Sequence, residues 1–189
     1  MNGKSISTLS RRQAVLGLAG ASLGALATPL RVHAQATPTA SPTAASAFPV
    51  TITHIAGETA IPARPERIVA ATDFLDLDTL LTLGIEPVTF GKVDPLSDLL
   101  PWQGAAAGIP TYDAATEIDL EAIAAANPDL IVTMPRYFDN WFETLSAIAP
   151  TIVIDWEDPW RDALRMVGRA TGEGERAEQE ITRADTLIS

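Results

Sequence analysis

The sequence predicts an α/β fold, a Rossmann-like lobe in which helices flank a mostly parallel sheet, with an N-terminal β-hairpin and a long C-terminal helix. Two short apolar runs, at residues 130–132 and 151–154, are typical of strands that are covered on both faces. Residues 138–148 between them fit a helix. A strand, a crossover helix and a second strand form a right-handed parallel unit. The 189 residues, 47% of them hydrophobic, are enough for one domain with a packed core.

Residues 1–36 are predicted to be an export signal rather than part of the fold. Basic residues precede an apolar run of small residues at 14–30, and an Ala-Gln-Ala cleavage-type sequence follows that run. The pair Arg11 and Arg12 resembles a twin-arginine signal, although Ala14 stands where phenylalanine is common, so an ordinary secretory signal is the alternative. The run is shorter than the roughly 20 residues of a membrane span, which favours cleavage over a membrane anchor.

Composition narrows the classes of partner. The chain has no cysteine, which excludes a disulfide framework and a cysteine nucleophile and predicts that the exported protein is not a lipoprotein. Its net charge is −11, and the export signal contains four basic residues and no acidic ones, so removal of the signal leaves −15. Such an acidic body repels nucleic acid and anionic lipid. From the export signal and this charge we expect an exported protein of the periplasm, cell envelope or extracellular space that binds no nucleic acid and does not insert into the membrane after cleavage.

A linker and a hairpin are predicted to follow the signal. Residues 37–47 are rich in Thr, Pro, Ala and Ser and cannot bury enough apolar surface to order themselves, which predicts a disordered linker. The folded lobe is expected to begin at residue 48. Residues 50–54 alternate in hydrophobicity like a half-buried strand, residues 56–58 suit a turn, and residues 59–61 return as the second strand of a β-hairpin.

Two core strands with a helix between them are predicted next. Residues 67–71 are the first core strand of the sheet, and residues 85–91 are the following strand. Asp73 is expected to cap the intervening helix, because its carboxylate can accept from the backbone N–H groups of the first turn. Gly84 is expected to end the helix.

Residues 92–115 are predicted to be a long loop, because they lack periodicity and contain several prolines. Loops of this length are usually functional or disordered. Trp102 and Tyr112 lie within it. Two interpretations of these aromatic residues remain open, namely packing onto the body of the lobe and contact with a ligand.

The final predicted helix spans residues 158–189. Asp158 suits the N-cap and Pro159 the first helical position, and Trp160 begins an apolar face. The Thr-Gly-Glu-Gly sequence at residues 171–174 interrupts the pattern, as either a kink or a short loop. The pattern stays apolar to the end of the sequence without a cap, which predicts that this helix is incomplete.

The residues that could support catalysis or bind a metal are few. His54 is the one histidine outside the predicted signal, so no second histidine or cysteine is available for a metal centre. The sequence has no nucleophile elbow, phosphate loop or dinucleotide fingerprint. Asp73, Asp76 and Asp78 lie around a helix start, where the helix dipole favours acids, and we interpret them as capping and solvated residues. The sequence therefore predicts no enzyme, no metal site and no intrinsic cofactor.

Candidate ligand-binding residues follow the predicted strands. In open parallel sheets, ligands bind beyond the carboxyl ends of the strands. The candidates are Asp73 and Phe74 after the first core strand, Arg136 and Tyr137 after the strand near residue 130, and Trp156 after the next strand. Arg136 could give charge-assisted hydrogen bonds to anionic oxygens or could be an ordinary surface residue. The aromatic residues offer flat apolar surface.

Five ordered sequence blocks carry a family resemblance. They are Arg-Ile-Val-Ala at 67–70, Leu-Gly-Ile-Glu-Pro-Val at 83–88, Asp-Leu-Glu-Ala-Ile-Ala-Ala at 119–125, Asn-Pro-Asp-Leu-Ile-Val at 127–132, and Ile-Ala-Pro-Thr-Ile-Val at 148–153. Together they resemble the substrate-binding proteins of iron-siderophore, haem and cobalamin ABC importers, over residues 48–189. The resemblance implies a truncated class III solute-binding protein. Residues 48–157 would be its N-terminal ligand-binding lobe, and residues 158–189 the incomplete backbone helix that leads to a second lobe.

The resemblance also implies a function. A monomer would capture a metal chelate, most simply a ferric siderophore, and deliver it to an ABC permease without making or breaking a bond. Relatives line the cleft with aromatic residues near Trp102 and Tyr112, which supports the ligand interpretation of these two. Haem and cobalamin are alternative ligands. An exported sensor or interaction domain of the same fold is an alternative function. A third possibility is a non-functional fragment, because half a cleft should bind weakly.

Glu121 is the residue for which the resemblance implies a partner contact. Asp119 is a good N-cap, so Glu121 falls in the first turn of a helix, where an acid is stabilised by the dipole whatever its function. In the resembled family, the glutamate of this block projects from the outer surface of the lobe and pairs with an arginine of the permease. Glu117 is the neighbouring residue that could take this function instead.

Overall fold

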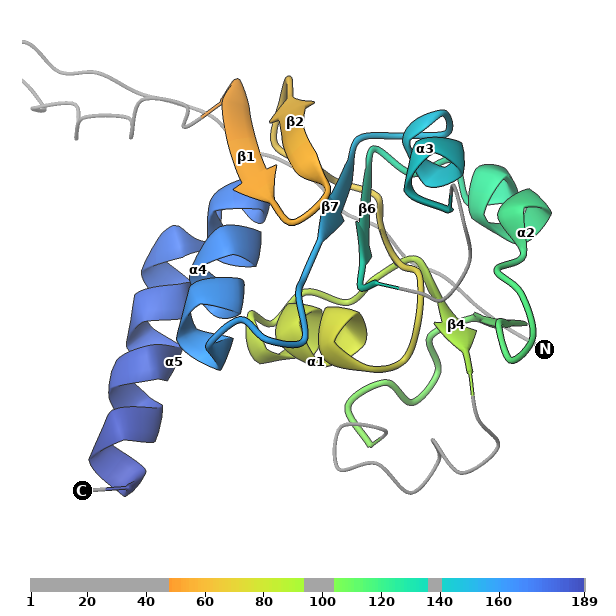
Figure 1. Cartoon of the computed structure of the whole chain (residues 1–189). Coiled ribbons are helices and arrows are strands. Elements are labelled where there is room, and N and C mark those ends of the chain that lie inside the picture. Colours follow the sequence, from red (N-terminus) through yellow and green to blue (C-terminus); the bar gives the residue numbers. More distant parts are fainter. Residues whose placement is uncertain (1–47, 94–103, 136–140, 189) are drawn as a thin grey trace, which may run out of the picture. The chain divides into compact units, whose positions relative to one another are not determined.

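The computed structural model describes residues 48–93, 104–135 and 141–188 (Figure 1). The predicted export signal and linker lie outside these residues. So do three of the predicted site residues, which are Trp102, Arg136 and Tyr137.

A five-stranded parallel sheet is the centre of the described part, with the strand order β5-β4-β3-β6-β7. Its strands are β3 (Ile68–Ala70), β4 (Thr89–Lys92), β5 (Thr111–Asp113), β6 (Leu130–Thr133) and β7 (Thr151–Val153). The predicted α/β fold is confirmed. Strand β4 begins at Thr89, later than predicted. The reason is that Ile85 still closes the end of the preceding helix, because its N–H donates to the carbonyl of Leu80 at 2.9 Å.

The N-terminal hairpin consists of β1 (Val50–His54) and β2 (Gly57–Ile61), paired antiparallel. His54 lies opposite Gly57, so the turn falls on residues 55 and 56, one position earlier than predicted. The hydroxyl of Thr59 donates to the carbonyl of Thr151 at 2.6 Å and joins the hairpin to β7. This hydrogen bond attaches the hairpin to the edge of the sheet at β7, and Figure 1 shows the hairpin next to that strand.

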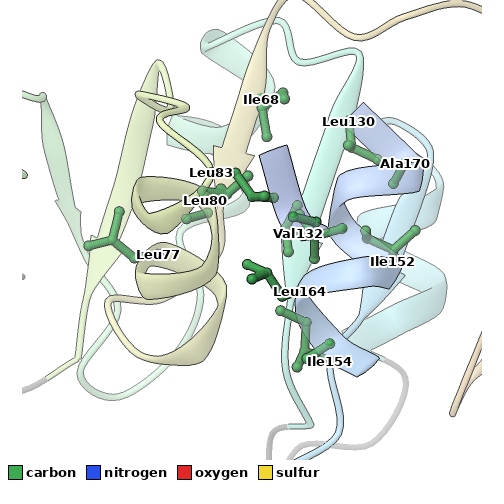
Figure 2. Packing of buried hydrophobic residues seen from close by; sticks show 14 of the residues in the cluster. Ile68, Leu77, Leu80, Leu83, Leu130, Val132, Ile152, Ile154, Leu164 and Ala170 are labelled. Atoms are coloured by element: carbon green, nitrogen blue, oxygen red, sulfur yellow. The ribbon is translucent and has the colours of Figure 1, made fainter. Parts of the chain in front are cut away.

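Apolar residues alternate between the two faces of the sheet. Ile68 and Ala70 of β3 belong to one buried cluster, whereas Val69 between them belongs to the other. Figure 2 shows Leu164 packed against the strands near Val132, in the first cluster. Burial of one such side chain contributes about 1.5–3 kcal/mol to stability. A sheet with two buried faces has no solvated side, which accounts for the near-continuous apolar runs in its strands.

Helices cover both faces. The first cluster includes residues of the hairpin and of helices α1 (Leu75–Thr82), α4 (Trp160–Thr171) and α5 (Gly174–Leu187). The second includes residues of α2 (Leu120–Ala125) and α3 (Trp141–Ser146). None of the described helices is both long and apolar enough to cross a membrane.

The C-terminal region forms two helices instead of the single predicted one. Gly172 adopts a left-handed φ of +79° and ends α4, so the short-loop interpretation of residues 171–174 is correct. The chain then reverses, and Arg165 of α4 pairs with Glu178 of α5 at 2.7 Å. Figure 1 shows α4 and α5 side by side. Gly168 permits this close approach, because a Cβ at that position would lie 2.9 Å from the Cβ of Ala177.

The start of α4 also differs from the prediction. Pro159 occupies the N-cap position and no side chain caps the helix, so the predicted cap by Asp158 is wrong. Trp160, predicted on a buried face, is 45% exposed. Trp160 is the first residue of α4, and the buried face of this helix begins only at Ala163 and Leu164.

Candidate functional site

Two aromatic side chains meet at the carboxyl edge of the sheet. Phe74 follows β3 and Trp156 follows β7, and the centroids of their rings lie 6.1 Å apart. Trp156 is 57% exposed and Phe74 is partly buried. Because parallel strands end at the same edge, the topology brings together residues that are far apart in the sequence. The pair presents an apolar surface at the edge where the sequence predicted ligand binding.

A buried carboxylate holds the turn that carries Phe74. Asp76 accepts from the backbone N–H of Thr72 at 2.6 Å, from the Thr72 hydroxyl at 2.6 Å and from the Leu77 N–H at 3.1 Å. The Thr72 hydroxyl also lies 3.3 Å from the sulfur of Met134, at the end of β6. Burial raises the pKa of Asp76 to about 7, against the opposing effect of the hydrogen bonds from Thr72.

The interpretation of Asp73 and Asp76 as capping and solvated residues is wrong. Both are fully buried, and α1 has Phe74 at its N-cap position with no side-chain cap. A carboxylate oxygen of Asp73 accepts from the N–H of Val93 at 3.3 Å and so connects the turn after β3 to the segment after β4. Asp76 therefore binds groups of its own turn, whereas Asp73 binds a backbone N–H of another segment.

Tyr112 lies in a strand rather than in a loop. It belongs to β5, which pairs in parallel with β4, so the prediction of a loop throughout residues 92–115 is wrong at this point. The residue is 8% exposed, and its hydroxyl donates to the carbonyl of Ala71 at 3.1 Å. This geometry favours the packing interpretation of Tyr112 over contact with a ligand. The sequence signal for this strand is the polar, aromatic, polar order of residues 111–113, which matches their exposed, buried, exposed order in the structure.

A cavity of about 280 Å³ adjoins Trp156 between α1, the segment after β7 and the start of α4. Its lining includes Asp78, Thr79, Asp155, Trp156, Asp158 and Trp160. Partial burial raises the pKa of Asp78. Asp78 and Trp160 are far apart in the sequence, and only the packing of α1 beside α4 brings them into one cavity.

His54 has a structural environment. Its Nε2 lies 2.9 Å from the hydroxyl of Thr59 across the hairpin, and its ring lies edge-on to Phe142 at a centroid distance of 5.4 Å. Partial burial lowers its pKa. Among the residues that the structure describes, no three His, Cys, Asp or Glu side chains are arranged to hold a metal ion.

The surface around α2 is acidic. Asp119 caps this helix as predicted, with its carboxylate accepting from the Ala122 N–H at 2.9 Å. Glu121 lies in the first turn and is exposed. A hollow of about 430 Å³ beside it is lined by Asp113, Glu117, Asp119 and Glu121, among others. The two candidate glutamates, Glu117 and Glu121, therefore belong to one acidic surface.

The sequence profile of the periplasmic binding protein family matches residues 69–187. The chain belongs to this family. The matched residues include those of the parallel sheet from residue 69 onward and those of the α4–α5 pair. They also include the candidate ligand-binding residues, the first of which is Asp73 and the last Trp156. Proteins of this family bind substrates and are not enzymes.

Relatives of this periplasmic binding protein include characterised and solved proteins. The probable siderophore-binding lipoprotein YfiY of Bacillus subtilis is 33% identical over 144 residues, which cover 74% of this chain and 43% of YfiY. The ferric enterobactin-binding periplasmic protein FepB of Escherichia coli is 27% identical and matches 77% of this chain and 49% of FepB. The structure of Streptococcus pneumoniae PiaA in complex with ferrichrome superposes with a TM-score of 0.64 at 26% identity, over 74% of this chain and 50% of PiaA. The chain thus spans about half the length of the relatives it matches.

Proposed function

We propose that this chain captures a ferric siderophore at the carboxyl edge of its sheet, as part of a solute-binding protein that delivers the chelate to an ABC permease. The pair formed by partly buried Phe74 and exposed Trp156 carries the proposal. The names of the relatives, which refer to siderophores, ferric enterobactin and ferrichrome, support the class of ligand. Haem and cobalamin also suit aromatic walls and are the alternative ligands.

The proposed mechanism is contact and release, without bond-making. The aromatic rings contact apolar parts of the chelate, while the hydrogen bonds between Thr72 and Asp76 hold the turn that presents Phe74. Trp102, Arg136 and Tyr137 remain candidates for further contacts, with Arg136 facing anionic oxygens of the chelate. We propose no catalytic residue and no intrinsic cofactor, because the iron arrives within its chelator as cargo.

The proposed domain organisation follows the sequence. Residues 1–36 would export the protein to the periplasm or cell envelope, and residues 37–47 would link the signal to the fold. Residues 48–157 would be the N-terminal lobe, and residues 158–189 would begin the connection to a second lobe. The protein would act as a monomer.

Glu121 is proposed as the contact with the permease. It is exposed in the first turn of α2, and the hollow beside it is also lined by Asp113, Glu117 and Asp119. A cluster of acids at a surface attracts a basic group on a partner and accelerates encounter. This charge pattern supports docking of an arginine side chain at this place.

Ligand binding is tested by calorimetric titration of the full-length exported protein with ferric siderophores, haem and cobalamin. We expect Trp156→Ala to weaken binding of the preferred ferric chelate about tenfold, or about 1.4 kcal/mol. Trp141→Ala is the matched control, because Trp141 packs against the second cluster, to which neither Phe74 nor Trp156 belongs. The proposal fails if no ferric chelate binds, or if the two substitutions weaken binding equally.

Docking is tested by uptake of the radioactively labelled ferric chelate into cells. We expect Glu121→Arg to abolish most uptake while leaving the affinity for the chelate unchanged, because charge reversal repels a basic partner surface. Glu175→Arg on α5 is the control, since Glu175 is an exposed acid in the first turn of another helix. Normal uptake with Glu121→Arg would overturn this assignment.

A further inference from the structure

The cavity beside Trp156 has indole walls that suit a cation. Trp156 and Trp160 line it and are 57% and 45% exposed. The face of an indole ring attracts ammonium and guanidinium groups. Trp160 already has one such contact with a residue outside the lining, because the guanidinium carbon of Arg161 lies 4.5 Å from the centroid of the Trp160 ring.

The polar part of the lining is negatively charged. Asp78 of α1, Asp155 after β7 and Asp158 before α4 all line the cavity, and none of the described lining residues is basic. Asp155 is held in place, because its carboxylate accepts from the N–H of Glu157 at 3.1 Å. Asp78 is partly removed from water, which makes a positive partner favourable for its charged form.

The shape favours an organic cation over a bare metal ion. The carboxylates come from three separate segments, and the described residues contain no group of acids arranged to hold a metal. Indole walls offer apolar surface to a methylene chain, whereas a small hard cation requires a shell of oxygen ligands. A cavity of about 280 Å³ has room for a protonated amine with part of its alkyl stem.

We infer that this cavity binds the cationic end of the ligand, so that the preferred chelate is a ferric hydroxamate bearing a protonated amine rather than an anionic catecholate or carboxylate chelate. The inference rests on the proposed function, because it assigns a charge class to the ligand of the same edge. Trp156 connects the cavity to the candidate ligand edge, since it lines the cavity and its ring lies beside that of Phe74 at the edge. Carboxylates at this place would attract a cationic chelate and repel a polyanionic one.

The test compares two chelates that have the same iron-binding groups and differ at the terminal amine, which is charged in one and acetylated in the other. Ferrioxamine B is a ferric trihydroxamate with a free protonated amine, and its N-acetylated form has the same iron-binding groups without that charge. We expect the full-length protein to bind ferrioxamine B about tenfold more tightly than the acetylated form, as measured by calorimetry at low salt. The preference should shrink as salt is added, because ions screen the partly exposed carboxylates.

Matched variants test whether the cavity carboxylates cause the preference for the amine-bearing chelate. The double substitution Asp155→Asn and Asp158→Asn should abolish the preference for the amine while leaving the affinity for the acetylated chelate unchanged. Glu157→Gln removes a neighbouring exposed charge that does not line the cavity, and it should retain the preference.

The outcomes separate this inference from the proposed function. Equal affinity for the two hydroxamates, tighter binding of a ferric catecholate, or a preference that survives the double substitution would each overturn the inference and leave siderophore binding intact. Failure of every ferric chelate to bind would instead refute the proposed function.

Discussion

Replacement of Asp76 by asparagine tests whether the carboxyl that holds the turn after β3 is buried in the core. The Asp76 carboxyl is fully buried, and its pKa is about 7 in the folded protein compared with an ordinary value of 3.8. In the pH range between these two values the folded state retains a proton that the unfolded state has lost. The corresponding stability is fully present below pH 3.8 and is lost as the pH rises through about 7.

The structure sets the size of this effect. A difference of about three pKa units corresponds to a total of about 4 kcal/mol. With those two pKa values, about 2.5 kcal/mol of the loss falls between pH 5 and pH 8. For a domain whose total stability is about 5–15 kcal/mol, this is a measurable fraction.

The assay is urea unfolding of the wild type and Asp76→Asn at pH 5 and pH 8. The wild type should lose about 2.5 kcal/mol more than the variant between these pH values, because asparagine does not titrate. Contributions from Asp78, whose pKa burial also raises, are common to both proteins and cancel in the comparison. Asp158→Asn, at an exposed position, is the control and should behave as the wild type does. An equal loss in the wild type and Asp76→Asn would refute the burial of this carboxyl.

Three further substitutions test the fold around the site. Gly91→Ala should destabilise the protein by about 1–3 kcal/mol, because its Cβ would lie 2.4 Å from the carbonyl oxygen of Ala71; an unchanged melting temperature would contradict this packing. Asp119→Ala should lower the free energy of unfolding in urea by about 1 kcal/mol and Asp119→Ser by much less, and equal losses would argue against the capping hydrogen bond. Tyr112→Phe should cost about 1 kcal/mol in the same assay and leave the affinity for the chelate unchanged, whereas a weakened affinity would favour the ligand interpretation.

Much of the fold could be predicted because its signals are local. The core strands at residues 68–70 and 130–133 are short apolar runs, and their burial on both faces follows from that pattern. Asp119 caps α2 through a hydrogen bond to a residue three positions away. Gly84 follows α1 with a left-handed φ of +73°, which glycine adopts without steric cost. Each of these features is decided within a few residues.

The candidate site was predictable only in part. Phe74 and Trp156 could be placed at one edge from the rule for parallel sheets, and the structure brings their rings together. The cavity lined by Asp78 and Trp160 could not be predicted, because it depends on how α1 packs beside α4.

The sequence by itself determined the α/β class, four of the five strands of the sheet and the terminal hairpin, and it placed Phe74 and Trp156 at one edge of that sheet. Only the tertiary structure decided that Asp73 and Asp76 are buried, that Tyr112 belongs to the core, and that the last region is a pair of antiparallel helices. Periodicity and capping depend on neighbours along the chain, so the sequence contains them directly. The environment of a carboxylate or a phenol depends on segments that are distant in sequence, and it is fixed only when those segments pack together.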